Sequence, residues 1–162
     1  MNQLFDLLGQ YFWLVCIVVA LVNFMLSDRF GIAEEDRGVD RELRRKYLGR
    51  FWGLSVLPWL VVGYAQITGA VPSIWAYFRP QDRNPYVWTF YGAILLVYGV
   101  IAYWTLFMDG ARIAEELRLL KSNAHGKGGV VSAFWMKIIA IGLLPFFAFW
   151  LFLIWEMNVP VQ

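Results

Sequence analysis

The sequence predicts an all-α integral membrane protein, a bundle of four transmembrane helices with short helical extensions on the cytoplasmic side. Of its 162 residues, 60% are hydrophobic and 16% charged, whereas a soluble domain is roughly 45–50% apolar and about 25% charged. Four apolar runs, at 7–26, 51–71, 86–108 and 134–155, are each long enough to supply the roughly 20 residues that cross a bilayer. We therefore expect one membrane domain over residues 1–162.

The first apolar run, 7–26, contains no charged residue and has the aromatic residues Tyr11, Phe12 and Trp13 near its start. No Lys or Arg precedes the run, and it is too long for the apolar region of a typical signal peptide, so we expect a retained helix. Asn23 is its strongly polar residue. A buried amide of this kind is typical of a hydrogen bond between membrane helices, and a ligand site is the alternative.

A strongly charged connector, 27–50, follows, with seven basic and six acidic residues. Asp40 with Arg44, and Glu42 with Lys46, have the i,i+4 spacing of helical ion pairs, which predicts a short helix running into the second span. We interpret the connector as a solvated, self-paired cytoplasmic loop. A docking surface for a protein partner or for anionic lipid headgroups is the alternative.

Small residues and prolines mark the remaining spans as packing helices. Pro58 should kink the second helix and Pro145 the fourth. Gly92 and Gly99 are seven residues apart on the third helix, so they share one face and predict a groove for another helix. The helical pattern continues past the third span through Asp109 as far as residue 121.

The central connector, 72–85, is rich in aromatic residues, prolines and arginines. Its aromatic side chains are typical of a membrane interface, and its prolines predict turns. One interpretation is an anchor that fixes the tilt of the adjoining helices. The other is a recognition surface for a carboxylate or phosphate. The candidate residues of that surface are Trp75, Tyr77, Arg79, Asp82 and Arg83.

The runs Tyr77-Phe-Arg-Pro80 and Asn84-Pro-Tyr-Val87 resemble a set of small bacterial four-helix inner-membrane proteins. The resemblance covers the central connector and the start of the third helix. It implies a bacterial inner-membrane location and brings no catalytic residue and no function to this chain.

Basic residues predict the orientation. The 27–50 connector contains seven Lys and Arg, the 109–133 connector four, and the central connector two. Because cytoplasmic loops are enriched in these residues, we expect connectors 27–50 and 109–133 in the cytoplasm. Both termini and the central connector would then lie outside.

The sequence contains few residues that could act in catalysis or bind a metal ion. The chain has one His and one Cys, and its predicted spans contain no Asp or Glu. Clustered titratable groups, metal ligands or a bis-histidine haem site are therefore not expected. Gly126-Lys127 lacks the spacing of a phosphate-binding loop. We expect no cofactor, no metal, no nucleic-acid partner and no enzymatic activity.

These observations favour a non-enzymatic accessory or scaffold subunit in the lipid bilayer, bound to a membrane-protein partner or to copies of itself. The alternative is a small transporter or channel that acts as an oligomer. A third hypothesis is a lipid-modifying enzyme centred on Arg79, Asp82 and Arg83. The residues expected to serve helix packing are Asn23, Pro58, Gly92, Gly99 and Pro145.

Overall fold

The computed structural model describes residues 2–30, 38–120 and 129–156, and this part of the chain is helical. Predictions for 31–37 and 121–128, which include His125 and Lys127, lie outside the described residues. Two short 3-10 helices, η1 (Ile74–Phe78) and η2 (Pro80–Asp82), separate the second and third α-helices. The five α-helices are α1 (Asn2–Phe30), α2 (Arg41–Ile67), α3 (Pro85–Phe107), α4 (Gly110–Glu116) and α5 (Ala133–Glu156).

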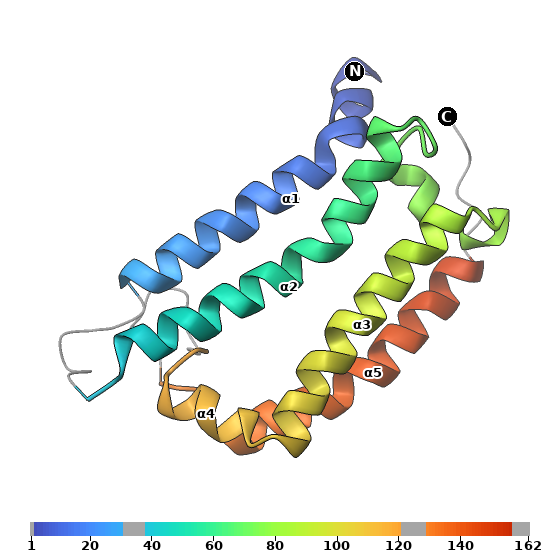
Figure 1. Ribbon diagram of the computed structural model, residues 1–162. Coiled ribbons are helices and arrows are strands. Elements are labelled where there is room, and N and C mark those ends of the chain that lie inside the picture. The colour runs from blue at the N-terminus through green and yellow to red at the C-terminus, as the bar shows by residue number, and fades with distance from the viewer. Residues whose placement is uncertain (1, 31–37, 121–128, 157–162) are drawn as a thin grey trace.

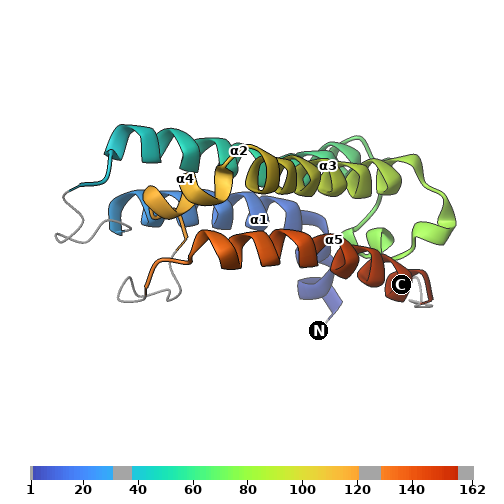
Figure 2. The same cartoon turned by 90° about the horizontal axis from the view of Figure 1, so that it is seen from below.

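The four long helices run antiparallel to their neighbours in the order α1, α2, α3, α5 (Figure 1). Figure 2 shows α2 and α3 in one layer and α1 and α5 in the other. The start of α1, the 72–85 connector and the end of α5 lie at one end of the bundle, called here the cap end. The start of α2 and all of α4 lie at the opposite end, called the head end.

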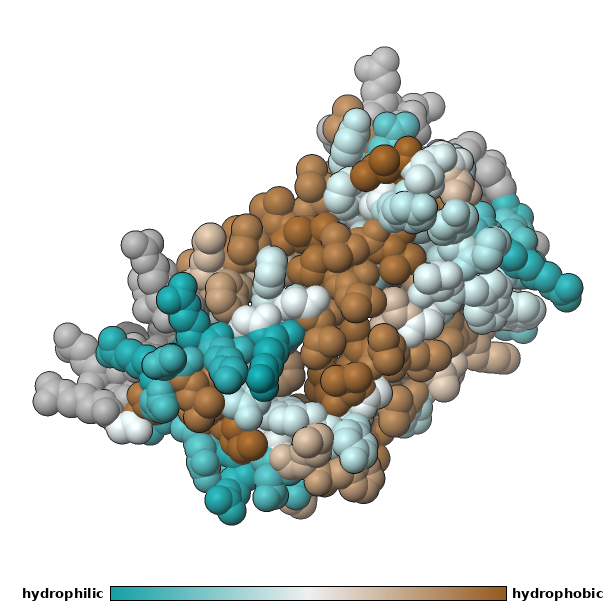
Figure 3. All heavy atoms as spheres, viewed as in Figure 1, coloured by the Kyte–Doolittle hydropathy of each residue, from teal (hydrophilic) through white to brown (hydrophobic). Residues whose placement is uncertain are grey.

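In the part of the chain that the structure describes, three helices are long and apolar enough to cross a membrane: Leu7–Ser27 within α1, Pro85–Phe107 and Ala133–Glu156. They confirm three of the predicted spans closely. Figure 3 shows the corresponding pattern on one face, where a hydrophobic band crosses the middle and hydrophilic atoms gather at both ends.

The fourth predicted span, 51–71, is not among these candidate spans. Its helix, α2, begins in charged sequence at Arg41 and ends at Ile67, short of the predicted Val71. Gly69 ends α2 because it adopts a φ of 71°, a left-handed conformation that glycine tolerates and other residues rarely adopt. Thr68 completes the end by donating its hydroxyl to the Tyr64 carbonyl at 2.9 Å.

The predicted continuation of the third helix to residue 121 is wrong. Asp109 adopts a φ of 55° and separates α3 from α4. Gly110 then lies against Trp104, so closely that an added Cβ would be 2.3 Å from the indole Cδ2. The break turns α4 toward α5 instead of extending α3 in a straight line, and α4 contacts both helices.

The predicted helix running into the second span is confirmed by α2. Asp40 caps it, accepting a hydrogen bond of 3.0 Å from the Leu43 backbone N–H. Arg44 faces inward and is 2% exposed. Its guanidinium donates to the Ser27 carbonyl at 2.9 Å, which ties the last turns of α1 to the first turns of α2.

The larger core cluster lies toward the cap end and joins α2, η1, α3 and α5. Its buried members are Val62, Ala65, Val71, Ile74, Tyr77, Val87, Phe90, Tyr91 and Phe147. A smaller cluster at the head end, formed by Ala111, Ala114 and Met136, holds α4 against α5. The cap end is therefore the more extensively packed part of the bundle.

Candidate functional site

The 72–85 connector forms a compact cap whose turns are fixed by side-chain hydrogen bonds. Ser73 Oγ accepts from the Trp75 backbone N–H at 3.4 Å, at the start of η1. Asn84 Oδ1 accepts from the Tyr86 N–H at 2.9 Å and caps α3, while its amide donates to the Ala70 carbonyl at 3.3 Å. Asn84 thus joins the end of α2 to the start of α3.

The cap contacts all four long helices. Its η1 packs against α1, where a Cβ at Gly9 would lie 2.6 Å from Ser73 Oγ, and its η2 packs against α5. The Tyr91 hydroxyl of α3 donates to the Tyr77 carbonyl. On the same side, Gln66 of α2 donates its amide to the Gly9 carbonyl at 3.1 Å. These contacts make the cap part of the rigid bundle.

Tyr77 belongs to the core and not to a recognition surface, which corrects the sequence prediction for this residue. Its side chain is 2% exposed, and its ring meets Phe90 edge-on with centroids 5.0 Å apart. Burial raises the pKa of the Tyr77 phenol to about 12. Its hydroxyl has no hydrogen-bond partner among the described residues.

The three charged residues of the predicted surface are held close together but have different environments. Arg79 Nε lies 3.3 Å from Asp82 Oδ2 and forms an ion pair that lacks hydrogen-bond geometry. Arg83 follows η2 with a φ of 55° and is exposed. Within the described part of the chain, the Arg83 guanidinium makes no ion pair, so its charge is available to a partner.

Two large aromatic side chains at the cap end are also exposed. Trp75 is 48% exposed and Trp88, on the first turn of α3, is 45% exposed. Trp88 also approaches Trp155 of α5, with ring centroids 6.4 Å apart. The exposed cap surface therefore consists of Trp75, Asp82, Arg83 and Trp88. Trp88 is not among the residues predicted for this surface, although its position at the start of a predicted helix pointed to it.

The glycines predicted to pack helices together do not contact another helix among the described residues. A Cβ added to Gly92 or Gly99 would meet nothing within 4 Å. Close contacts occur elsewhere: a Cβ at Gly63 would lie 2.7 Å from Trp13 Cε3. The face of α3 that contains Gly92 and Gly99 is open. Sequence spacing found two glycines on one face but could not reveal whether a neighbour covers that face.

The other predicted packing residues have mixed outcomes. Asn23 is exposed on α1 and makes no hydrogen bond among the described residues, so the predicted interhelical bond is not formed there. Pro58 lies inside α2 and is buried, and Figure 1 shows a bend partway along that helix. Pro145 lies inside α5, which remains one continuous helix.

Two hollows open between the helices near the head end. One, between α1 and α2, has a volume of about 680 Å³ and includes Asn23, Ser27 and Ser55 in its lining. The other, between α2 and α3, has a volume of about 550 Å³ and is lined by Arg50, Gly99, Trp104 and apolar neighbours. The second lies well away from the cap surface, whereas the first extends along α1 as far as Phe12.

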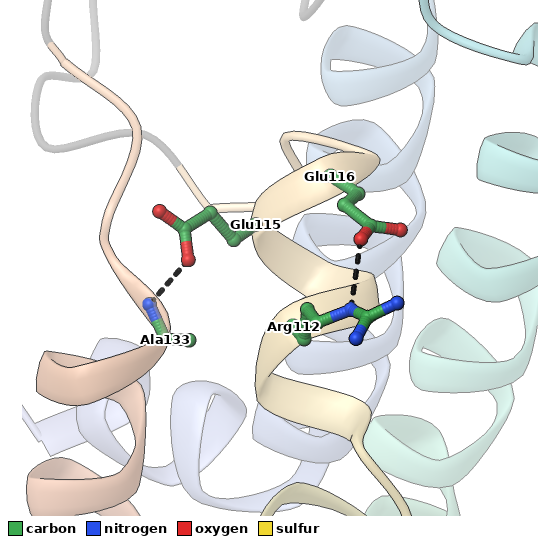
Figure 4. Close-up of polar contacts among 4 residues, drawn as sticks. All are labelled: Arg112, Glu115, Glu116 and Ala133. Carbon is green, nitrogen blue, oxygen red and sulfur yellow. Dashed lines mark hydrogen bonds and ion pairs between the residues drawn. The ribbon is translucent and has the colours of Figure 1, made fainter.

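At the head end, a polar contact joins α4 to the start of α5 (Figure 4). Glu115 Oε2 accepts a hydrogen bond of 2.9 Å from the backbone N–H of Ala133, the first residue of α5. The next residue, Glu116, pairs with Arg112 on the same helix: Arg112 Nε lies 3.0 Å from Glu116 Oε1, and both side chains are well exposed. Glu115 therefore positions α5, whereas Glu116 pairs within its own helix.

Over residues 2–30, 38–120 and 129–156, no three His, Cys, Asp or Glu side chains lie together in an arrangement that could hold a metal ion. Comparison of the chain with protein-family models, with curated proteins and with solved structures finds no match. The function must therefore be argued from the geometry of this molecule.

Proposed function

We propose that the protein is a non-enzymatic accessory or scaffold subunit of a membrane complex and that the cap surface contacts its partner. The observation behind this proposal is that a cap attached to all four long helices exposes two tryptophans and an arginine. Trp and Arg are enriched among the residues that dominate binding energies at protein interfaces. A preorganised surface also loses less conformational entropy on binding.

Four membrane crossings are part of this proposal. The apolar helices α1 and α3 adjoin opposite ends of α2: α1 leads to its start at the head end, and α3 follows its end at the cap end. If α1 and α3 both cross, the chain between them must return, and α2 is the segment that does so. Neighbouring helices on both sides shield α2, which compensates for its lower apolar content.

We prefer a scaffold to a pore because the interior of the bundle is packed at the cap end. Buried apolar side chains fill the cap end, and the Gln66 amide and the Tyr91 hydroxyl there donate to the Gly9 and Tyr77 carbonyls. A solute path through a single copy would have to disrupt this packing. The alternative, a transporter or channel, would therefore require a path between copies.

We place the protein in a bacterial inner membrane, with the cap end outside and the head end in the cytoplasm. The support is the excess of Lys and Arg in the 27–50 and 109–133 connectors. A labelling experiment tests the orientation and the number of crossings together. Arg83→Cys and Arg41→Cys, exposed positions on either side of α2, each in a Cys16→Ser background, are treated with a membrane-impermeant maleimide on intact spheroplasts. We expect labelling of the first variant alone. Equal labelling of both would contradict the four-span topology.

The function is tested by gentle extraction of the full chain from its native membrane, followed by mass determination of the intact complex. We expect a heteromeric complex of fixed stoichiometry that the double variant Trp75→Ala, Arg83→Glu loses. The matched control is Arg41→Glu, a charge reversal on an exposed residue at the head end, which should retain the complex. A lone protein that conducts ions or small metabolites in liposomes would overturn the proposal.

A further inference from the structure

The hollow between α2 and α3 combines an apolar lining with one cation at its rim. Leu54 of α2 and Leu96 and Val100 of α3 contribute to its walls, and Gly99 leaves space between them. Arg50 is exposed, and among the described residues it is the only charged group in the lining. The hollow therefore has the polarity of a site for an amphipathic molecule with a negative group at one end.

Aromatic residues gather around the charged rim. The Arg50 guanidinium carbon lies 5.6 Å from the centre of the Tyr47 ring, within cation–π range. Trp104 lines the hollow, with its ring 5.7 Å from Tyr47 and 5.1 Å from Phe51. Tyr and Trp beside a cation are typical of the depth at which lipid headgroups meet acyl chains. Lys46, one helical turn before Arg50, is exposed and adds positive charge on that side.

Size distinguishes a lipid from a helix as occupant. The hollow holds about 550 Å³, within the roughly 300–1,000 Å³ of small-molecule sites. A spanning helix about 10 Å wide and 30 Å long occupies on the order of 2,000 Å³, so it could place only part of one side there. A flexible acyl chain can follow the hollow along its length.

Charge argues against a second copy of the protein. Two copies in one membrane have the same orientation, so packing their α2–α3 faces together would place both Arg50 guanidiniums at the same depth. Like charges at that position would repel each other. An anionic group is the complementary occupant.

We propose that this hollow binds one anionic glycerophospholipid, with its phosphate at Arg50 and an acyl chain between α2 and α3 beside Gly99. Arg suits this role because its planar guanidinium forms charge-assisted hydrogen bonds with phosphate oxygens. The site is independent of the cap surface, which lies at the opposite end of the bundle. Failure of either proposal leaves the other standing.

Native mass spectrometry of the purified full chain in detergent, titrated with phosphatidylglycerol or with phosphatidylcholine, tests the proposal. We expect one phosphatidylglycerol to bind in preference to phosphatidylcholine. Arg50→Gln should weaken binding of the anionic lipid about tenfold or more and remove the preference. Gly99→Leu should abolish specific binding of both lipids, because its side chain would enter the hollow.

Two control variants match these changes. Gly92→Leu lies on the same open face of α3 but outside the lining of the hollow, and Arg41→Gln removes an exposed charge from the same helix as Arg50. Both should bind lipid as the unmodified chain does, and all four variants should retain its melting temperature.

Equal binding of the two lipids by the unmodified chain would overturn the proposal, as would an Arg50→Gln variant with unchanged preference. A lipid-free dimer that Gly99→Leu dissociates would assign the hollow to a second copy instead. A protein subunit that co-purifies in place of lipid and is lost in Gly99→Leu would assign it to a partner helix.

Discussion

Glu115 and Ala133 are separated by 18 positions in the sequence, yet the Glu115 carboxylate accepts a hydrogen bond of 2.9 Å from the Ala133 backbone N–H. Ala133 is the first residue of α5, so this N–H has no acceptor within its own helix. A carboxylate here also interacts favourably with the positive end of the helix dipole. The contact joins the short helix α4 to the last membrane helix.

Replacing Glu115 with Ala should therefore loosen the docking of α5. We expect a loss of about 1 kcal/mol in the free energy of unfolding, the usual contribution of a helix-capping group. Unfolding in detergent, followed by circular dichroism, measures the change. Glu116→Ala is the control, since its exposed ion pair with Arg112 should contribute no more than a few tenths of a kcal/mol. Equal losses in the two variants would contradict the capping role.

The contact between Gly63 and Trp13 predicts that two glycines of α2 differ in how well they tolerate replacement by Ala. A Cβ at Gly63 would lie 2.7 Å from Trp13 Cε3, so Gly63→Ala should force α1 and α2 apart and cost about 1–3 kcal/mol. Gly53→Ala, on the same helix, would meet nothing within 4 Å. It should be neutral or stabilise by up to about 1 kcal/mol through helix propensity. Thermal unfolding of both variants distinguishes them, and a tolerated Gly63→Ala would contradict close packing at this point.

The two buried tyrosines of the cap end should respond differently to loss of their hydroxyls. Tyr91 donates its hydroxyl to the Tyr77 carbonyl, so Tyr91→Phe leaves a buried carbonyl without that donor and should cost about 1–3 kcal/mol. The Tyr77 hydroxyl has no partner among the described residues. Tyr77→Phe should therefore be nearly neutral at pH 7. Chemical denaturation at that pH compares the pair, and a large loss in Tyr77→Phe would contradict the assignment.

Tyr77 also predicts a dependence on alkaline pH. Its pKa is about 12 in the folded protein and about 10 in an unfolded chain, so between these values the unfolded state has lost the proton while the folded state retains it. The free energy of unfolding should then fall as pH rises from 10 to 12, by up to about 2–3 kcal/mol. Below pH 10 this contribution to stability is fully present.

Comparing Tyr77→Phe with the unmodified chain across that range isolates this contribution, because the variant lacks the titrating phenol. The stability of Tyr77→Phe should decline less steeply between pH 10 and pH 12. Identical slopes for the two proteins would show that the Tyr77 phenol ionises in the folded state as readily as in the unfolded one.

The positions of the apolar helices and the early start of α2 could be predicted from short stretches of sequence. Uninterrupted apolar runs located α1, α3 and α5 to within a few residues, because the length of a hydrophobic stretch relates directly to bilayer thickness. The helical charge spacing after Asp40 predicted the early start of α2.

Sequence could not assign the inward faces, and the candidate site shows why. In water, an apolar side chain identifies a buried face, but in a bilayer it is equally favourable against lipid and against another helix. Gly92 and Gly99 share a face that the chain leaves open. Tyr77, in a connector rich in interfacial residues, is instead buried in the core.

The helical and apolar segments can be located from the amino-acid sequence, since both properties arise from neighbouring residues. The folded arrangement of the helices is what turns Tyr77 inward, leaves Trp75 and Arg83 outside, and lets Arg44 join α2 to the end of α1. It also decided that α3 stops at Asp109. The physical reason is that each outcome depends on the fit between distant segments, such as Gly63 with Trp13 and Gly110 with Trp104, and side-chain packing of that kind has no local signature.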